Sequence, residues 1–282
     1  MVRYPVLLLR TVLTLLRQRP RLVLVQNPSM VLALFMVAVG RVSNIRVVVD
    51  AHNEGVAPFS PRLRWLSPLY ALVQHWAHRT IVTNEALARI VRANRGRPVV
   101  LPDRLPGFER VQSRGLKGRY NFVYICTFAK DEPFREVIGA GRLLDKDTVI
   151  YITGRHERAG LGGGRMPENV VLTGFIPEQA YVDLLFSSNG VIDLTLMQDC
   201  LVCGAYEAVA LGKPMVLSDT RALRAYFREG AVYTDSTGEG IAHAVRTVIR
   251  DEGRLKEEVR RLSRTLREEW KQQHEHLLRA LA

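Results

Sequence analysis

Cysteine is scarce in this sequence. The 282 residues include only Cys126, Cys200 and Cys203, too few for a disulfide framework, which favours a reducing compartment. Cys200 and Cys203 form a C-x-x-C pair, but no second pair or nearby histidine completes a tetrahedral zinc site. We therefore predict no zinc here and expect both cysteines to line a packed loop.

Long uninterrupted apolar runs are also missing. Residues 22–39 would be long enough to cross a membrane, but the polar stretch 26–29 interrupts them, and 30–39 alone is too short. Near the start, Arg10 breaks the apolar stretch, and no small-residue cleavage site follows. The sequence predicts neither a membrane span nor a signal peptide, and we expect a cytoplasmic protein.

Acidic residues are outnumbered, 28 against 40 basic ones, which gives a formal net charge of +12. Such an excess suits nucleic acid, an anionic membrane surface or phosphorylated substrates. The sequence has no zinc-finger spacing, no aromatic RNA-binding motif and no basic recognition helix, so it does not favour nucleic acid. A phosphorylated substrate and an anionic membrane surface are the partners that the charge favours.

What the sequence does contain is a regular alternation of helical and strand patterns. This alternation predicts an α/β fold with parallel sheets in two Rossmann-like domains. The first domain is predicted over 1–113 and the second over 119–253, and a long charged helix follows over 254–282. The stretch 102–118, rich in Pro, Gly and Arg, is predicted to be a linker between them.

The amino-terminal domain is predicted to open on a helix over 5–17. Arg3, Arg10 and Arg17 recur every seven residues and share one helical face. We interpret it either as a surface helix with a solvated basic stripe or as a helix that faces an anionic membrane. No strand is predicted before the one over 22–25.

The most informative segment is 199–219. Asp199 and Glu207 lie eight residues apart, and Gly204 between them opens a predicted short helix, which a Gly-Lys-Pro turn and a buried strand follow. Unpaired amides at a helix start suit a diphosphate. Glu207, one turn into the helix, can accept hydrogen bonds from the hydroxyls of a ribose, and Asp199 can do the same for a hexose. The alternative is a plain helix-turn-strand unit.

A second polar cluster is the run Asp50-Ala51-His52-Asn53-Glu54, which ends the strand predicted over 45–50. Ligands of open parallel sheets bind at the carboxyl ends of the strands, so this run is a candidate site. The alternative is that Asp50, His52 and Asn53 only cap the segment that follows.

These motifs resemble the nucleotide-sugar site of GT-B glycosyltransferases, in particular the family-four group, whose pattern is Glu, seven residues, Glu. This chain departs from that pattern by having Asp199 at the first position. The strings Gln26-Asn27-Pro28 and 49–53 resemble a similar pair in the dolichol-linked chitobiose mannosyltransferases. The resemblance covers roughly residues 20–250 and is dense over 120–219.

The resemblance implies a GT-B fold, in which two Rossmann-like domains with parallel sheets face a cleft and the carboxyl-terminal helix crosses back to the first domain. The first domain would lack the strand with which GT-B enzymes begin, so we expect that the chain is truncated at its start or that another subunit supplies that strand. The implied donor site consists of Lys130 and the Gly204 and Ala205 amides for the diphosphate, Gly174 for the base and Glu207 for the ribose. In the loop that carries Lys130, after the strand predicted over 122–126, family-four members carry an Arg and a Lys, whereas this chain has Lys130 alone. The alternative for Asp131, next to it, is that it only caps the helix that Pro133 opens.

The resemblance also implies the residues that act on the sugar and the acceptor. His52, Glu54 and Asp199 are the implied catalytic residues, and Asn27 and Asn53 lie on the acceptor side. No Asp-x-Asp motif is present, and a lysine with a helix dipole can meet the leaving-group charge, so no metal and no cofactor are expected.

The implied activity is that of a glycosyltransferase, and a hexosyltransferase in particular. It would use a nucleotide-sugar donor and a lipid-linked or polysaccharide-precursor acceptor, in the cytoplasm and peripherally on the inner face of the membrane. Two alternatives stay open. One is a sugar-nucleotide epimerase of the UDP-GlcNAc 2-epimerase type, which shares the architecture. The other is a non-catalytic subunit that supplies a nucleotide domain to a partner.

Overall fold

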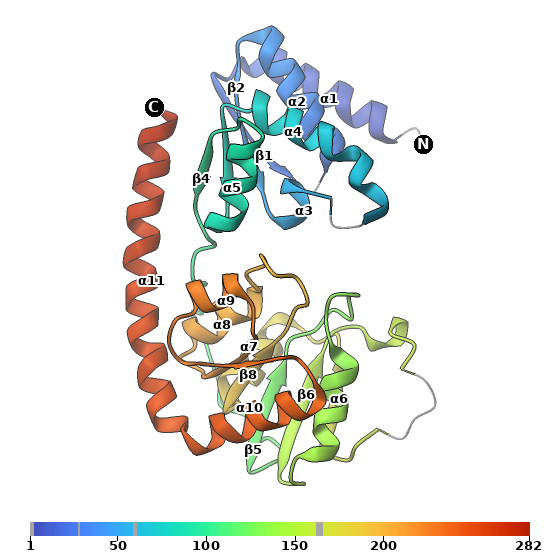
Figure 1. Ribbon diagram of the computed structural model, residues 1–282, viewed down its shortest axis with the longest axis vertical. Coiled ribbons are helices and arrows are strands. Elements are labelled where there is room, and N and C mark those ends of the chain that lie inside the picture. The colour runs from blue at the N-terminus through green and yellow to red at the C-terminus, as the bar shows by residue number, and fades with distance from the viewer. Residues whose placement is uncertain (1–2, 28, 59–60, 162–165) are drawn as a thin grey trace. The chain divides into compact units, whose positions relative to one another are not determined.

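The computed structural model describes residues 3–27, 29–58, 61–161 and 166–282 (Figure 1). The chain divides into two compact units. Unit 1 consists of Met1–Pro102 and Gln272–Ala282, and unit 2 of Asp103–Lys271. Each unit contains one sheet of parallel strands with helical connections, so the predicted α/β fold with parallel sheets is confirmed.

The sheet of unit 1 has the strand order β1-β2-β3-β4. Its strands are β1 (Leu22–Asn27), β2 (Arg46–Ala51), β3 (Arg79–Val82) and β4 (Pro98–Val100). The helices of the amino-terminal part are α1 (Arg3–Gln18), α2 (Met30–Ser43), α3 (Asn53–Val56), η1 (Pro61–Leu66), α4 (Ser67–Trp76) and α5 (Glu85–Ala93). Among the described residues, β1 pairs with β2 alone and forms one edge of the sheet.

Two apolar layers hold unit 1 together. On one face, Met36 and Val37 of α2 and Val91 of α5 pack against Val49 in a buried cluster. A second cluster joins Val48, Ile81 and Val99 to Leu277 near the carboxyl end of the chain. Burial on both faces explains why the strands are runs of valine and isoleucine rather than alternating patterns.

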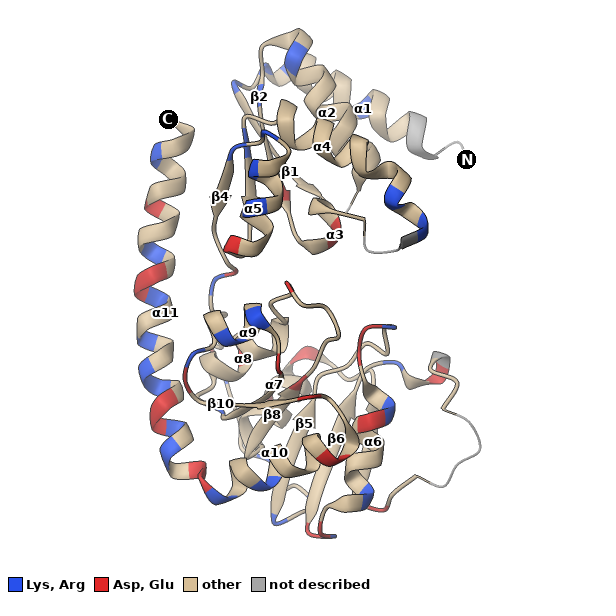
Figure 2. Cartoon of the chain, in the orientation of Figure 1, with Lys and Arg blue, Asp and Glu red and all other residues tan. Residues whose placement is uncertain are grey.

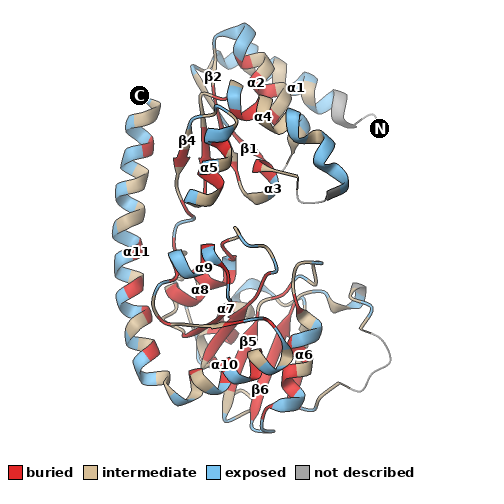
Figure 3. Cartoon of the chain, in the orientation of Figure 1, coloured by how far each residue is buried: buried red, intermediate tan, exposed pale blue. Residues whose placement is uncertain are grey.

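The sheet of unit 2 has the order β10-β9-β8-β5-β6-β7. Its strands are β5 (Tyr120–Tyr124), β6 (Thr148–Thr153), β7 (Val170–Gly174), β8 (Gly190–Asp193), β9 (Met215–Ser218) and β10 (Ala231–Thr234). Its helices are α6 (Phe134–Leu143), η2 (His156–Arg158), α7 (Glu178–Ser187), α8 (Cys203–Ala210), α9 (Arg221–Tyr226), α10 (Gly238–Arg250) and α11 (Glu252–Leu281). Its central strands are buried along their length, as the red arrows in Figure 3 show.

The segment predicted to be a linker is bound to unit 2, whose boundary lies after Pro102. The backbone N–H of Gln112 donates to Asp183 Oδ1 at 2.9 Å, and the N–H of Lys117 donates to the Tyr151 hydroxyl at 2.8 Å. Leu105 is buried in the core of the unit. The composition correctly indicated an irregular segment, but these contacts make it part of the second domain rather than a free connection.

Local chemistry also explains two other differences from the prediction. The sequence pattern predicts a helix over 65–78, but α4 begins at Ser67, because Pro68 occupies the first turn of α4 and the residues before it form the 3-10 turn η1. Strand β10 and the single turn α3 were not predicted. Each is only four residues long, too short for a clear hydrophobic period.

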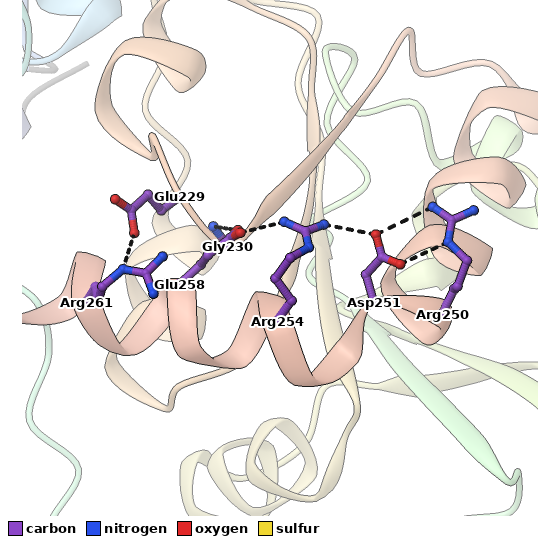
Figure 4. Close-up of polar contacts among 7 residues, drawn as sticks. All are labelled: Glu229, Gly230, Arg250, Asp251, Arg254, Glu258 and Arg261. Atoms are coloured by element: carbon purple, nitrogen blue, oxygen red, sulfur yellow. Dashed lines mark hydrogen bonds and ion pairs between the residues drawn. The ribbon is translucent and has the colours of Figure 1, made fainter.

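Ion pairs fix the start of the charged carboxyl-terminal helix α11 (Figure 4). Asp251 pairs with Arg250 and Arg254 at 2.9 Å each, and Arg254 also pairs with Glu258. Glu258 in turn accepts the backbone N–H of Gly230 at 3.1 Å. These contacts fasten the first turns of α11 to the turn before β10. The residues of α11 from Gln272 onward belong to unit 1.

None of the helices in the described part of the chain has the length and hydrophobicity that a membrane span requires.

Candidate functional site

The start of α8 lies at the carboxyl edge of the unit 2 sheet. As predicted, Gly204 is in the first turn of this helix. The Asp193 side chain, at the end of β8 and 7% exposed, interacts with the backbone N–H groups of Gly204 and Ala205. A Cβ at position 204 would lie 2.6 Å from Asp193 Oδ2 and 2.3 Å from Ile125 Cδ1, so only glycine fits.

The protein itself therefore supplies a carboxyl group to the first turn of α8. The prediction that the Gly204 and Ala205 amides are unpaired is wrong, and their contact with a diphosphate stays a prediction. Burial raises the pKa of Asp193 well above its usual range, and the charges of Glu132 and Glu207 add to the rise, while the two N–H groups oppose it. The group is thus biased toward its protonated, uncharged form.

Glu207 lies one turn further along α8 and is half-buried. The Tyr181 hydroxyl of α7 donates a hydrogen bond to its Oε2. Burial raises the pKa of Glu207, and the bond from Tyr181 opposes this rise. Burial and the carboxylate of Glu207 raise the pKa of Tyr181, which keeps its hydroxyl a donor. Tyr181 was not predicted, because the pairing depends on how α7 packs beside α8.

Asp199 lies on the loop between β8 and α8, as predicted, and is half-buried. The first cysteine of the C-x-x-C, Cys200, is half-buried on the same loop, but Cys203 is exposed at the first position of α8. The expectation that both cysteines line a packed loop is therefore wrong for Cys203. Within the described residues, no group of three or more His, Cys, Asp or Glu side chains is placed to hold a metal ion.

Lys130 is exposed on the loop between β5 and α6. Glu132, which was not predicted, shapes this loop by accepting hydrogen bonds from the backbone N–H groups of Thr127 at 2.9 Å and Ala129 at 2.8 Å. The Thr127 hydroxyl donates to the same carboxylate at 3.0 Å. A carboxylate with three donors holds the loop in one conformation, which presents Lys130 at the carboxyl edge of the sheet.

Asp131 does not cap α6, contrary to the alternative that its sequence favoured. The cap position is Pro133, and Asp131 Oδ2 instead accepts a hydrogen bond from the Thr195 hydroxyl at 3.0 Å. The backbone oxygen of Asp131 also accepts the N–H of Leu196 at 2.8 Å. The loop that carries Lys130 is thereby tied to the loop that leads to Asp199.

Gly174 ends β7 with a φ of +68°, a left-handed conformation that favours glycine. The next residue, Phe175, is 74% exposed, and the Arg155 guanidinium lies 5.1 Å from the centroid of its ring. A flat apolar ring and a flat cation therefore lie together at the carboxyl ends of β6 and β7. Such a pair can stack against another planar group.

In unit 1, Asn27 ends β1 and its Nδ2 donates to the Gly55 backbone oxygen at 3.1 Å. A Cβ at Gly55 would lie 2.3 Å from the Asn27 backbone oxygen, so α3 and β1 meet closely here. The Oδ1 atoms of Asn27 and Asn53 are buried without a hydrogen-bond partner among the described residues. Pro28, part of the predicted motif, lies outside those residues.

His52 and Asp50 face each other at the carboxyl end of β2. His52 Nε2 lies 3.7 Å from Asp50 Oδ1, and the His52 side chain is 46% exposed. His52 occupies the cap position of α3 through its backbone oxygen, but its side chain makes no capping bond. The capping alternative is therefore wrong for this side chain. Glu54 is exposed, and its charge adds to the burial that raises the pKa of Tyr70.

The structure brings the predicted residues together at the carboxyl edge of each sheet. In unit 2 the ends of β5, β7 and β8 lead to Lys130, Gly174 and Asp199. In unit 1 the ends of β1 and β2 lead to Asn27 and to the run 50–54. The sequence did contain a signal for Asp193, which is a lone acid at the end of a buried apolar strand, but none for Tyr181.

Comparisons with known proteins show the fold. No protein-family model matches the sequence, and no curated protein matches it significantly. The structure of HepE from Anabaena in complex with UDP-glucose is similar at a TM-score of 0.71 and 13% identity, over 90% of this chain and 78% of HepE. TarM is similar at 0.68 and 13%, over 92% of this chain and 54% of TarM.

A Listeria monocytogenes protein assigned as a UDP-N-acetylglucosamine 2-epimerase is also similar, at a TM-score of 0.55 and 13% identity. The likeness covers 88% of this chain and 70% of that protein. At such identities the likeness shows the fold alone, and that fold is GT-B.

Proposed function

We propose that this chain is a glycosyltransferase of the family-four type, and specifically a hexosyltransferase that uses a nucleotide-sugar donor. The observation that carries the proposal is Glu207, a half-buried acid that Tyr181 orients at the carboxyl edge of the unit 2 sheet. Ligands of open parallel sheets bind at this edge, and a carboxylate there can accept both hydroxyls of a ribose. The UDP-glucose bound to HepE makes UDP-glucose the first donor to test.

The diphosphate of the donor is proposed to lie between Lys130 and the start of α8. Because the raised pKa of Asp193 favours its uncharged form, this side chain does not repel an anion as a carboxylate would. The exposed ammonium of Lys130 can then meet the leaving-group charge without a metal, and the Gly204 and Ala205 amides can join it once the diphosphate displaces the Asp193 side chain. The base is proposed to lie against Gly174 and to stack on the Arg155–Phe175 pair.

The acceptor is proposed to meet the carboxyl edge of unit 1. His52 is the proposed base, because Asp50 at 3.7 Å can orient its ring and stabilise its protonated form. Glu54 is a second acid at the same edge, and Asn27 and Asn53 shape the site. Asp199 is proposed to hold the transferred sugar.

The acceptor is proposed to be lipid-linked or a polysaccharide precursor, reached from an anionic membrane surface on the cytoplasmic side. Supporting this proposal, α1 exposes one row of apolar side chains and places arginines beside it. The row consists of Val6, Leu9, Leu13 and Leu16, and Arg10 and Arg17 flank it. The Arg3 side chain of the predicted basic stripe lies outside the described residues.

The test is calorimetric titration of the purified chain with UDP-glucose, GDP-mannose and ADP-glucose, followed by transfer assays with the donor that binds. Saturable binding of one donor is the expected result. Lys130→Ala should then lower turnover more than donor affinity, because the leaving-group charge grows toward the transition state. If none of the three donors binds, the proposal fails.

The similarity to the Listeria protein favours one other activity, epimerisation of a nucleotide sugar. Incubation with UDP-N-acetylglucosamine in the absence of an acceptor separates the two. An epimerised sugar nucleotide would establish that alternative, whereas a transferase leaves the sugar configuration of the unused donor unchanged. Donor binding without turnover on any acceptor would favour the non-catalytic subunit.

A further inference from the structure

In unit 1, basic residues lie at the amino ends of the strands and acidic residues near the carboxyl ends. The strands begin at or directly after an arginine: Arg21 precedes β1, Arg46 begins β2, Arg79 begins β3 and Arg97 precedes β4. The three acidic residues of 1–102 lie near the opposite ends, Asp50 and Glu54 at the end of β2 and Glu85 after β3. Figure 2 shows the same separation, with red at α3 and at the start of α5 and blue around the start of β2.

The amino end of this sheet contains a cavity of about 410 Å³. It lies where α2 and α4 end and where β2 and β3 begin. Its charged and titratable lining consists of Arg41, Arg46, Arg97, His75 and His78, and no Asp or Glu lines it. A hollow with several guanidinium groups and no carboxylate is suited to an anion, and guanidinium binds phosphate with particular strength.

Helix dipoles alone do not account for these arginines. The carboxyl ends of α2 and α4 face the cavity, and each carries a partial charge of about −0.5, or about −1 in total. Arg46 is already engaged, since it donates to the backbone oxygens of Leu281 at 2.7 Å and Ala282 at 3.3 Å. The two exposed guanidinium groups of Arg41 and Arg97 still carry +2, so positive charge remains in excess.

Two further observations agree with this excess. The Arg41 guanidinium lies 5.4 Å from the centroid of the Trp76 ring, and both residues line the cavity. Burial lowers the pKa of His78, and the charges of Arg79, Arg46 and Arg97 lower it further. The guanidinium groups around His78 therefore disfavour its protonated form, which agrees with an excess of positive charge in the cavity.

We propose that this cavity is a phosphate-binding site at the end of the sheet opposite His52. The two ends of a six-residue strand are about 20 Å apart, so the site is separate from the proposed acceptor residues. Its ligand carries a phosphate monoester, either on a soluble metabolite or on a lipid headgroup. The proposal does not depend on the glycosyltransferase function, because it rests on other residues.

The test compares Arg97→Glu with the matched control Arg89→Glu, which makes the same charge change on the exposed side of α5, outside the cavity lining. Arg97 is chosen over Arg46 because Arg46 also holds the end of α11. Circular dichroism and thermal unfolding establish that both variants fold. Glycerol 3-phosphate is titrated by calorimetry, and vesicles of phosphatidylcholine with phosphatidic acid are used for flotation, all at fixed ionic strength.

Saturable binding of glycerol 3-phosphate that weakens about tenfold or more in Arg97→Glu, and not in Arg89→Glu, supports a site for a soluble phosphate. The same dependence on vesicles alone assigns the site to a lipid headgroup. Equal weakening in both variants, or no binding of either probe, overturns the proposal. Affinity for the nucleotide sugar, measured in parallel, should be unchanged in Arg97→Glu.

Discussion

The two units differ most in the balance of their basic and acidic residues. Residues 1–102 contain 14 arginines, no lysine and three acidic residues, whereas residues 103–271 contain 25 basic and 24 acidic residues. In unit 2 many of these charges pair within the unit, as Arg228 does with Glu269 and Arg261 with Glu229. The net charge of the protein therefore belongs almost entirely to unit 1, where few carboxylates are available to neutralise it.

Exposed apolar side chains are also concentrated in unit 1. Among the described residues, eleven of the fourteen large apolar side chains that are exposed lie in unit 1, including Leu9, Leu16, Val42 and Trp65. Apolar and cationic groups exposed together are typical of a surface that contacts a partner or a membrane. Unit 2 instead buries its polar groups in specific internal contacts. The difference supports the proposals that unit 2 binds the nucleotide sugar and that unit 1 meets an anionic membrane surface.

The largest expected effect is a loss of sugar transfer without a loss of donor binding, which would assign the two activities to different units. His52→Ala should lower the rate of sugar transfer by about 10²–10⁴-fold, because a general base contributes on this scale. Donor affinity should change little, since the proposed nucleotide contacts belong to unit 2. Single-turnover kinetics and calorimetry on the same preparation measure both. His276→Ala, which removes an exposed histidine elsewhere in unit 1, is the control; an equal loss there would contradict a specific role for His52.

Glu207→Gln should produce the next largest effect, and it should act on binding. The change keeps the shape of the side chain but loses its charge, which should weaken donor binding by ~1.5–3 kcal/mol. Calorimetric titration measures the loss. Tyr181→Phe, which removes only the hydroxyl that orients Glu207, should cost less, about 0.5–1.5 kcal/mol. Unchanged donor affinity in Glu207→Gln would remove the central assignment of unit 2.

The sequence predicted the helices and strands of both units well, but it predicted the contacts between them poorly. Buried strands such as β8 are continuous apolar runs, which parallel sheets require on physical grounds, so their residues identify them. The position of His52 followed from the rule that the carboxyl ends of parallel strands carry the site. Glu207 followed from its place one turn into a predicted helix, and Lys130 from the family resemblance.

What the sequence did not predict depends on neighbours that are distant along the chain. Asp193 was not expected at the amides of α8, because that contact requires the loop 194–202 to fold back. Asp131 was expected to cap the next helix, which is the local choice, but its partner is Thr195, 64 residues later. Local propensity cannot rank such a contact above a nearby one.

Membrane binding should show a smaller effect and should be confined to unit 1. Replacing both Arg10 and Arg17 by Gln should reduce affinity for anionic vesicles by about 2 kcal/mol at low salt, because each surface arginine contributes about 1 kcal/mol. Flotation with anionic and neutral vesicles at two salt concentrations measures the change. The paired replacement of Arg228 and Arg261 in unit 2 removes the same charge and should leave flotation unchanged. An equal loss would mean that net charge alone is responsible.

The smallest expected effect concerns the pH dependence of stability in unit 2. The pKa of Asp193 is raised in the folded protein, so as pH rises above about 4 the unfolded chain loses this proton first. The folded state then binds more protons, and the contribution of Asp193 to the free energy of unfolding falls as pH rises toward its folded pKa. Asp193→Asn should remove this dependence.

Asp219→Asn provides a comparison of opposite sign within the same unit. The hydrogen bond from Arg224 lowers the pKa of Asp219, so its contribution is present at neutral pH and is lost as the pH falls through the folded pKa. Denaturant unfolding at several pH values, with each variant subtracted from the wild type, should therefore give two differences with opposite slopes. If both differences slope in the same direction, Asp193 is not held in its protonated form at the start of α8, and the account of how this helix accepts an anion must change.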